Sequence, residues 1–259
     1  MIYFRSILFN VVYYVVSTAM VIFSLPVFAF GNERAGAWVI RTWARTGIVL
    51  LRVLAGTRLE VRGLENLPPG GAIIASKHQS MFETFALFPR LPRPTYVMKR
   101  ELARIPLWGW YATRAGSITV ERDQGTAALR RLAADVSKAI AVGRQVIIFP
   151  EGTRSTPGAV PDYKGGIAHL YKISGAPVVP AALNSGLFWP RRRMLRFPGT
   201  IVIEFLPPIP PGLTSRAFMA RLTTEIEAAT NRLLAETAAA NSPPPMPPEA
   251  GRSVANPAV

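Results

Sequence analysis

The chain has 259 residues, of which 49% are hydrophobic, and its 30 Lys and Arg against 15 Asp and Glu give a formal net charge of +15. This length accommodates one sizeable domain and an additional segment, and the hydrophobic fraction excludes a disordered basic protein. The positive charge predicts a polyanionic partner and leaves nucleic acid, an anionic membrane surface and phosphorylated small substrates open. Cysteine is absent, which excludes disulfides, a cysteine nucleophile and thiolate metal sites.

The N-terminal segment predicts a membrane helix. Residues 7–30 contain no charged side chain, and about 20 residues at about 1.5 Å of rise each are enough to cross the core of a bilayer. We expect Pro26 to distort or end this helix. The alternative is a cleaved signal peptide, in which Arg5 supplies the charged region and cleavage follows Ala29.

A second apolar segment, residues 37–56, contains two tryptophans and is interrupted by three arginines. The tryptophans suit an interfacial position, and arginine side chains can reach lipid headgroups from such a helix. An ordinary amphipathic helix on a soluble domain is the alternative. Because this segment follows a predicted membrane helix, we favour a pair of membrane-associated helices over residues 1–56.

After Gly56, short apolar runs alternate with amphipathic stretches. This pattern predicts an α/β domain over residues 57–236, with a mixed, largely parallel sheet flanked by helices. The tail, residues 237–259, is rich in proline and is predicted to be disordered. The predicted strands cover residues 71–76, 95–99, 117–121, 145–149, 178–183 and 200–205, and the predicted helices cover residues 125–143, 165–174 and 215–236.

The stretch KHQSMFE, residues 77–83, follows the first predicted strand and contains one of the two histidines of the chain. Ligands of α/β domains bind outside the carboxyl ends of strands. The spacing of His78 and Glu83 can bring the two side chains together around a strand-to-helix turn. An imidazole is a competent general base near pH 7, and a carboxylate behind it fixes its tautomer. A surface turn at the end of a strand is the alternative.

The stretch FPEGTRS, residues 149–155, follows another buried strand and has the composition of a turn. Gly152 would allow the backbone to approach a ligand closely. Arg154 can donate two parallel hydrogen bonds to a phosphate, and Thr153 can add a hydroxyl. The alternative is a loop in which the arginine pairs with Glu151.

These stretches, in this order, resemble the 1-acylglycerol-3-phosphate acyltransferase family of glycerolipid acyltransferases. The resemblance covers residues 59–205, and FPEGTRS, identical to the third family motif, is its most specific part. VMKREL, residues 97–102, adds Lys99 at another strand end. The four family motifs correspond to His78 with Glu83, to GSITVER ending in Arg122, to FPEGTRS, and to VVPAAL with Pro180.

Two residues depart from the family pattern. The acid of the first motif is usually aspartate, and here it is Glu83, which is one methylene longer. A glutamate can still orient the imidazole if the backbone lies slightly farther away. The residue before the histidine is commonly asparagine, and here it is Lys77, which we expect to alter the charge near the acceptor pocket.

The resemblance implies transfer of a fatty acyl group from acyl-CoA or acyl-carrier protein to the free sn-2 hydroxyl of 1-acylglycerol-3-phosphate, giving phosphatidate. His78 would remove the hydroxyl proton and Glu83 would orient His78. No cofactor, metal or covalent acyl-enzyme is implied, in agreement with the absence of cysteine and of a Gly-x-Ser-x-Gly motif. The substrate-binding residues implied are Lys99, Arg122, Glu151, Gly152, Thr153, Arg154 and Pro180, with Lys99 and Arg154 holding the acceptor phosphate.

Because the acceptor and the product are lipids, we expect the enzyme at the inner (cytoplasmic) membrane, with its active site on the cytoplasmic side. The stretch LFWPRRRMLRF, residues 187–197, places Phe188 and Trp189 beside four arginines and suits an anionic lipid interface. A solvated basic loop, or a guide for CoA or an acidic carrier protein, is the alternative for this stretch.

Two other functions remain open. The same chemistry could act on a different lysolipid, such as a lyso-ornithine lipid, and the basic residues would then have a different role. A membrane-tethered protein without catalysis could bind anionic lipid or nucleic acid. The chain has no recognisable nucleic-acid module, and its basic residues are scattered among apolar segments, so a nucleic-acid partner is not expected.

Overall fold

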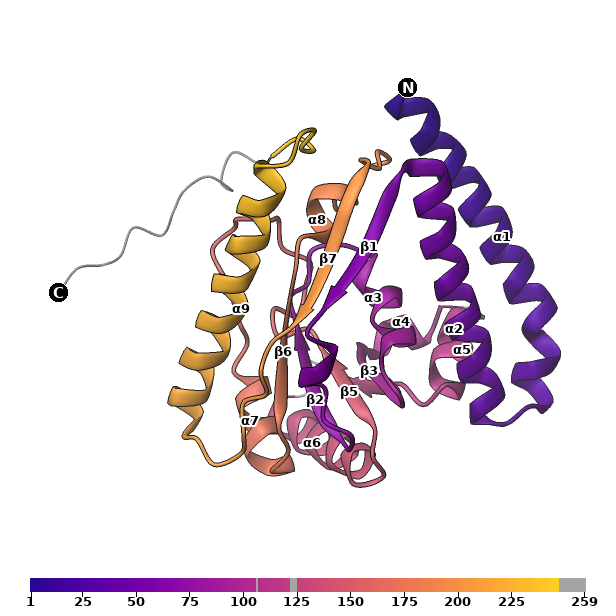
Figure 1. The fold of residues 1–259 in the computed structure, drawn as a ribbon. Coiled ribbons are helices and arrows are strands. Elements are labelled where there is room, and N and C mark those ends of the chain that lie inside the picture. The colour runs from indigo at the N-terminus through magenta and orange to yellow at the C-terminus, as the bar shows by residue number, and fades with distance from the viewer. Residues whose placement is uncertain (106, 122–124, 247–259) are drawn as a thin grey trace.

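The computed structural model describes residues 1–105, 107–121 and 125–246, and it contains one sheet of seven strands in the order β1-β7-β6-β2-β5-β3-β4 (Figure 1). All neighbouring strands are parallel except β6 and β7, which are antiparallel. The predicted fold class, an α/β domain with a mixed and largely parallel sheet, is therefore confirmed. The strands are β1 (Thr57–Arg62), β2 (Ala72–Ser76), β3 (Pro94–Lys99), β4 (Ile118–Val120), β5 (Gln145–Ile148), β6 (Val178–Leu183) and β7 (Gly199–Phe205).

Six of these strands match the predicted ranges, but sequence analysis missed β1. Its sequence, TRLEVR, alternates charged with apolar residues, and most of its side chains are only partly buried. Such a strand has a solvent-facing side, because β1 lies at the edge of the sheet and pairs with β7 alone. Because β1 has few apolar residues and follows a long apolar helix, its sequence did not stand out as a strand.

The two faces of the sheet are covered by different helices. Alternate residues of β2 point to opposite faces: Ile73 packs in the cluster of α6, α7 and α9, and Ile74 packs with the N-terminal helices. This double coverage explains why the central strands are apolar on both sides. The longer helices are α1 (Ile2–Phe30), α2 (Glu33–Leu50), α6 (Gly125–Ala141), α7 (Gly166–Ser174) and α9 (Ser215–Ala238), and the shorter ones are α3 (Glu83–Ala86), α4 (Arg100–Ala103), α5 (Trp108–Arg114) and α8 (Ser185–Phe188).

Helix α1 is the one described helix that is long and apolar enough to cross a membrane by length and composition. It continues through Pro26 to Phe30, so the proline does not end it. Helix α2 begins at Asn32, whose side chain accepts a hydrogen bond from the Ala35 N–H, and continues into a π-helical turn, η1 (Leu51–Ala55).

The N-terminal helices share a hydrophobic core with the sheet. Phe9 and Tyr13 of α1 are buried against Trp189, and Tyr13 also packs on Phe85. A chain cleaved after Ala29 would lose these contacts and leave large aromatic rings uncovered. The packing therefore argues against a removed signal peptide.

Residues 187–197 do not form the aromatic interface that we expected. Phe188 and Trp189 are buried in the core, since they fill the space between α1 and the sheet. Arg196 is also buried, stacks over the Trp189 ring at 4.2 Å, and donates a hydrogen bond of 3.0 Å to Asn10 Oδ1 of α1. Burial lowers the pKa of Arg196 to about 10, which leaves it charged at neutral pH. The exposed part of the stretch is residues 191–194.

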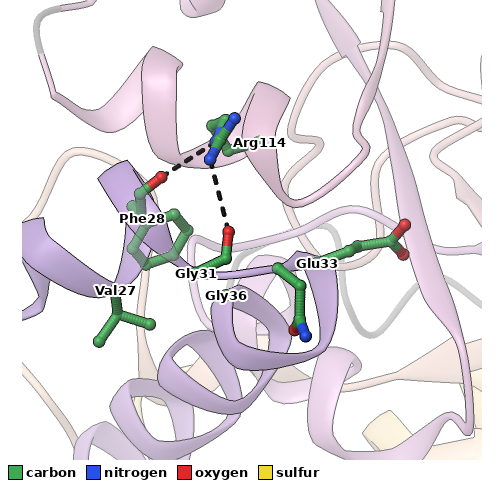
Figure 2. Close-up of a pocket in the computed structure, with 7 residues that line it drawn as sticks. Val27, Phe28, Gly31, Glu33, Gly36 and Arg114 are labelled. Carbon is green, nitrogen blue, oxygen red and sulfur yellow. Dashed lines mark hydrogen bonds between the residues drawn. The ribbon is translucent and has the colours of Figure 1, made fainter.

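The C-terminal end of α1 and the turn that follows it contact α5 and the residue before β5. Arg114 of α5 donates hydrogen bonds to the carbonyl oxygens of Phe28 and Gly31, at 3.0 and 3.5 Å (Figure 2). Glu33 forms an ion pair with Arg144, which immediately precedes β5. A pocket of about 280 Å³ lies at this turn, lined by Val27, Phe28, Gly31, Asn32, Glu33, Gly36 and Arg114 (Figure 2).

We predict that Asn10→Ala destabilises the fold by about 1–3 kcal/mol, because a buried guanidinium loses an acceptor. Asn10 Nδ2 also donates to the carbonyl of Met194 at 2.8 Å, and that bond is lost as well. Thermal unfolding of the purified protein in detergent measures the effect. Val11→Ala is the control, because Val11 is exposed on the same helix. Equal melting temperatures for the two variants would contradict the prediction.

Candidate active site

Three of the sequence motifs meet at one edge of the sheet. Strands β2, β5 and β3 are parallel neighbours, so their carboxyl ends lie side by side. His78 follows β2, the FPEGTRS loop at residues 149–155 follows β5, and Lys99 ends β3. This is the edge at which α/β proteins bind ligands. The pocket at the α1–α2 turn lies at the opposite edge, since it adjoins the start of β5.

The structure brings His78 and Glu83 together. His78 Nδ1 lies 2.9 Å from Glu83 Oε1, and the two side chains are 13% and 0% exposed. The imidazole stacks on the Phe149 ring, with 4.1 Å between the ring centroids. With Nδ1 directed at a carboxylate, the neutral imidazole carries its proton on Nδ1, and Nε2 is the nitrogen without a proton. The predicted pairing is thus present, with one nitrogen held and one available.

Glu83 is held by the backbone of the turn that carries His78. Its Oε1 accepts hydrogen bonds from the N–H groups of Gln79 and Ser80, at 2.7 and 2.6 Å. Its Oε2 accepts a hydrogen bond of 2.7 Å from the Ser185 hydroxyl. A buried carboxylate is costly unless its oxygens are satisfied, and here both are. Residues 78–80 and Glu83, the first residue of α3, therefore form one hydrogen-bonded unit.

The FPEGTRS loop holds the backbone of His78 from both sides. Glu151 Oε1 accepts a hydrogen bond from the His78 N–H at 3.3 Å, and the Ser155 N–H donates to the His78 carbonyl at 2.8 Å. Gly152 has a φ of +68°, a conformation that favours glycine and lets the loop turn between these two contacts. The loop and the histidine are therefore fixed relative to each other.

The predicted substrate-binding residues divide into outward and inward groups. Thr153 and Lys99 are exposed and Arg154 is partly exposed, so these three can reach a ligand. Glu151 is 4% exposed and faces Lys77 and the His78 backbone rather than Arg154. The loop in which Arg154 pairs with Glu151 is therefore not formed.

Two further predicted residues lie apart from the outward group. Pro180 is buried within β6, opposite Ala75 of β2, and its carbonyl accepts a hydrogen bond from the Leu206 N–H. Arg122 lies outside the described residues. Within the described part of the chain, no group of three or more His, Cys, Asp or Glu side chains could hold a metal ion.

Sequence analysis missed Ser185, which bonds Glu83 from 102 residues away. A signal was available, because LNS follows β6 and β6 neighbours β2 in the sheet. A polar residue just after a buried strand falls at the ligand-binding edge. The order of strands, which places β6 beside β2, was needed to use that signal.

Comparison with known proteins agrees with this geometry. Residues 58–184 match the Acyltransferase family. The chain is 37% identical to a 1-acyl-sn-glycerol-3-phosphate acyltransferase of Pseudomonas aeruginosa over 206 residues, which is 80% of this chain and 79% of that protein. The chain belongs to the 1-acyl-sn-glycerol-3-phosphate acyltransferase family. It is therefore an acyltransferase.

More distant relatives extend the likeness. The human 1-acyl-sn-glycerol-3-phosphate acyltransferase alpha is 30% identical over 174 residues, or 66% of this chain and 62% of the human protein. The solved structure of the 1-acyl-sn-glycerophosphate (LPA) acyltransferase from Thermotoga maritima superposes with a TM-score of 0.77 and 22% identity. That match covers 93% of this acyltransferase and 100% of the solved chain. The structural match establishes a shared fold that includes the N-terminal region.

We predict that Ser185→Ala lowers kcat roughly tenfold, because it leaves a buried oxygen of Glu83 without its donor, a loss of about 1–2 kcal/mol. Glu83→Gln should be more severe, by about 10²–10⁴-fold, since the charge that stabilises the imidazolium is removed. Steady-state acyl transfer by purified protein measures both.

Ser137→Ala is the matched control, because the Ser137 hydroxyl has no hydrogen-bond partner among the described residues. It should leave kcat unchanged. A Ser185→Ala variant as active as this control would show that the hydroxyl does not support Glu83.

Proposed function

We propose that this acyltransferase moves a fatty acyl group from an acyl thioester to the free sn-2 hydroxyl of 1-acylglycerol-3-phosphate, forming phosphatidate. The observation that carries the proposal is the pair formed by His78 Nδ1 and Glu83 Oε1, 2.9 Å apart. The loop that contains Arg154 bonds to the backbone of His78. The names of the relatives support the same acceptor.

In the proposed reaction His78 acts as general base. The Nδ1–H group donates a hydrogen bond to the buried Glu83 carboxylate and keeps its proton, and Nε2 removes the proton of the acceptor hydroxyl as the oxygen attacks the thioester carbonyl. The tetrahedral intermediate collapses, the carbon–sulfur bond breaks, and the thiolate leaves. His78 returns the proton to the sulfur, which restores the neutral imidazole. Glu83 stabilises the imidazolium between these two steps.

Arg154 and Lys99 are proposed to hold the phosphate of the acceptor. Both lie at the edge of the sheet that carries His78, and neither side chain has an ion-pair partner among the described residues. A cation that is not neutralised by a neighbouring carboxylate keeps its full attraction for a phosphate. Thr153 and the turn at Gly152 support the same contact, and Arg122 is proposed to join them.

We propose acyl-CoA or acyl-carrier protein as the co-substrate, with no further cofactor. The direct attack described above needs only a base, an oriented acceptor and a thioester with its own leaving group. Holding both reactants beside one base supplies part of the rate enhancement through proximity.

The proposal predicts that membranes containing the wild-type chain convert lysophosphatidate to phosphatidate and that His78→Ala lowers this rate by about 10³-fold, because the proposed general base is removed. Labelled lysophosphatidate and lyso-ornithine lipid are tested in parallel, each with acyl-CoA and with acyl-carrier protein. Product from only one donor identifies the co-substrate.

Arg154→Ala tests the proposed contact with the acceptor phosphate. It should raise the KM for lysophosphatidate and leave the KM for the acyl donor unchanged. Transfer by the wild type to the lyso-ornithine lipid alone would overturn the proposed acceptor. Equal activity of the wild type and His78→Ala would overturn the proposed base.

We further propose that the enzyme sits at the inner membrane with its active site on the cytoplasmic side and that α1 lies along one leaflet. Helices α1 and α2 lie beside the sheet at the edge of the molecule in Figure 1, and together with η1 they expose large apolar side chains. Apolar surface of this extent favours a lipid environment. Its exposed residues are Tyr3, Phe4, Ile7, Leu8, Val11, Tyr14, Val15, Ile22, Phe23, Phe30, Trp38, Val49 and Val53.

The other side of α1 contacts the α/β domain near both ends of the helix and contacts α2 in the middle. Ser6 bonds to Arg196 near the start of the helix, Ser17 accepts a hydrogen bond from Trp43 in the middle, and Phe28 accepts one from Arg114 near the end. A helix that crosses a bilayer has its two ends on opposite sides of a hydrocarbon core about 30 Å thick, so one water-soluble domain does not bind both ends. The contacts of α1 therefore support a helix embedded in one leaflet rather than a membrane-crossing helix.

Cysteine labelling tests this arrangement, because the chain has no cysteine of its own. A single cysteine is placed after Met1, or introduced as Arg34→Cys at the α1–α2 turn, and treated with an impermeant maleimide in sealed inner-membrane vesicles. Both positions should react from the cytoplasmic side. Reaction of the two positions from opposite sides would show that α1 crosses the membrane.

A further inference from the structure

Lys77, which immediately precedes His78, is buried together with two carboxylates. Its side chain is 2% exposed, and Nζ lies 2.7 Å from Glu227 Oε1 and 3.2 Å from Glu151 Oε1. The Tyr163 hydroxyl donates a hydrogen bond of 2.7 Å to the same oxygen of Glu227. The cluster joins the end of β2, the FPEGTRS loop and helix α9, three segments far apart in sequence.

The position of Lys77 differs from the sequence-based expectation. We expected its charge near the acceptor pocket, but the ammonium points into the protein and is neutralised there by carboxylates. Its backbone N–H donates to the Ala181 carbonyl of β6, so the chain enters His78 with Lys77 directed inward. The departure from the common asparagine therefore changes the interior of the site.

The cluster contains more negative than positive charge. Glu151 and Glu227 face one ammonium, and one oxygen of Glu151, Oε2, is buried without a hydrogen-bond partner among the described residues. Burial and the nearby Glu227 carboxylate raise the pKa of the Tyr163 hydroxyl well above its ordinary value, so Tyr163 acts as a neutral donor. Lys77 is thus the cation that pairs with the buried Glu151 carboxylate.

Glu151 connects this cluster to the proposed chemistry. The oxygen that lies near Lys77 Nζ also accepts the hydrogen bond of the His78 N–H. Two residues further along, past the turn at Gly152, the same loop presents Thr153 and Arg154. The position of the Glu151 carboxylate therefore sets the position of the proposed phosphate-binding loop relative to the imidazole.

We infer that Lys77 is a positioning residue for the reaction: through Glu151 it fixes the FPEGTRS loop against His78, and Glu227 and Tyr163 fix Lys77 in turn. The inference rests on the proposed function for its substrate and does not place Lys77 in contact with it. Removing the Lys77 charge should weaken binding of the acceptor phosphate, because Lys77 holds the FPEGTRS loop through Glu151 and is not part of the His78–Glu83 pair. The acyl donor is unaffected.

Lys77→Met tests the inference, since methionine fills a similar volume without charge. The KM for lysophosphatidate should rise at least about tenfold, because a displaced binding loop aligns its ligand poorly, while kcat changes less than about threefold. The KM for the acyl donor should stay constant. Glu227→Gln in the Lys77→Met background removes the surplus carboxylate and should restore part of the lost acceptor affinity.

Arg221→Met is the matched control, because Arg221 forms an exposed ion pair with Glu225 on the same helix as Glu227. It should leave both KM values unchanged. An acceptor KM for Lys77→Met equal to that of the control, with any loss of rate following the folded fraction, would overturn the inference.

Hydrogen exchange gives a readout that does not depend on the acceptor. Peptides covering residues 149–156 should exchange faster in Lys77→Met than in the wild type, and unchanged exchange there overturns the inference. If the wild type is inactive toward lysophosphatidate, the proposed acceptor is rejected. If the loop nevertheless exchanges faster in Lys77→Met than in the wild type, the positioning role of Lys77 is retained.

Tyr163→Phe is the second variant if Lys77→Met does not fold. It keeps every charge and removes one hydrogen bond from Glu227. The acceptor KM should rise by about two- to fivefold, because Glu227 loses one of the groups that hold its carboxylate beside Lys77. An unchanged acceptor KM overturns the inference.

Discussion

The site depends on satisfying one fully buried carboxylate. Glu83 is out of contact with solvent, and an ionised group in that position requires hydrogen-bond donors at both oxygens. The donors are the amides of Gln79 and Ser80, the His78 ring and the Ser185 hydroxyl. These four donors come from the β2–α3 turn and from the start of α8, so the requirement fixes the two segments together. The orientation of the imidazole is one result of that arrangement rather than a separate feature.

A second buried charge cluster stands behind the first. Lys77 and His78 are adjacent in sequence, yet their side chains enter different networks: Lys77 turns to Glu151 and Glu227, and His78 turns to Glu83. The backbone between them is held by the FPEGTRS loop on one side and by β6 on the other. Backbone hydrogen bonds and ion pairs therefore hold the chain at both Lys77 and His78. These contacts explain how a short turn holds His78 in a defined place.

Local patterns were enough to predict the fold class and the motif positions, but not the partners of each side chain. The central strands are apolar on both faces, so each could be predicted from a short run of apolar residues. Strand β1 has the mixed polarity of an edge strand and could not be predicted in this way. Strand ends located His78 and the FPEGTRS loop, because sheet geometry brings carboxyl ends together. Ser185, Glu227 and Asn10 lie about 100 to 190 residues from the groups they bond, and no local pattern reports such distances. The burial of Trp189 and Arg196 was missed for the same reason, since it is α1 that covers them.

The packing of α1 also bears on how the protein is made. Ser6 and Asn10 are synthesised first, but their partners at residues 194–196 come about 185 residues later. Until then Phe9 and Tyr13 lack the Trp189 ring that packs against both of them, and contacts of such long sequence separation form slowly. A bilayer offers a place for apolar side chains during that interval. The helix that we propose lies in the membrane in the finished enzyme could therefore also use the bilayer during synthesis, where lipid would cover an apolar surface whose protein partner has not yet been translated.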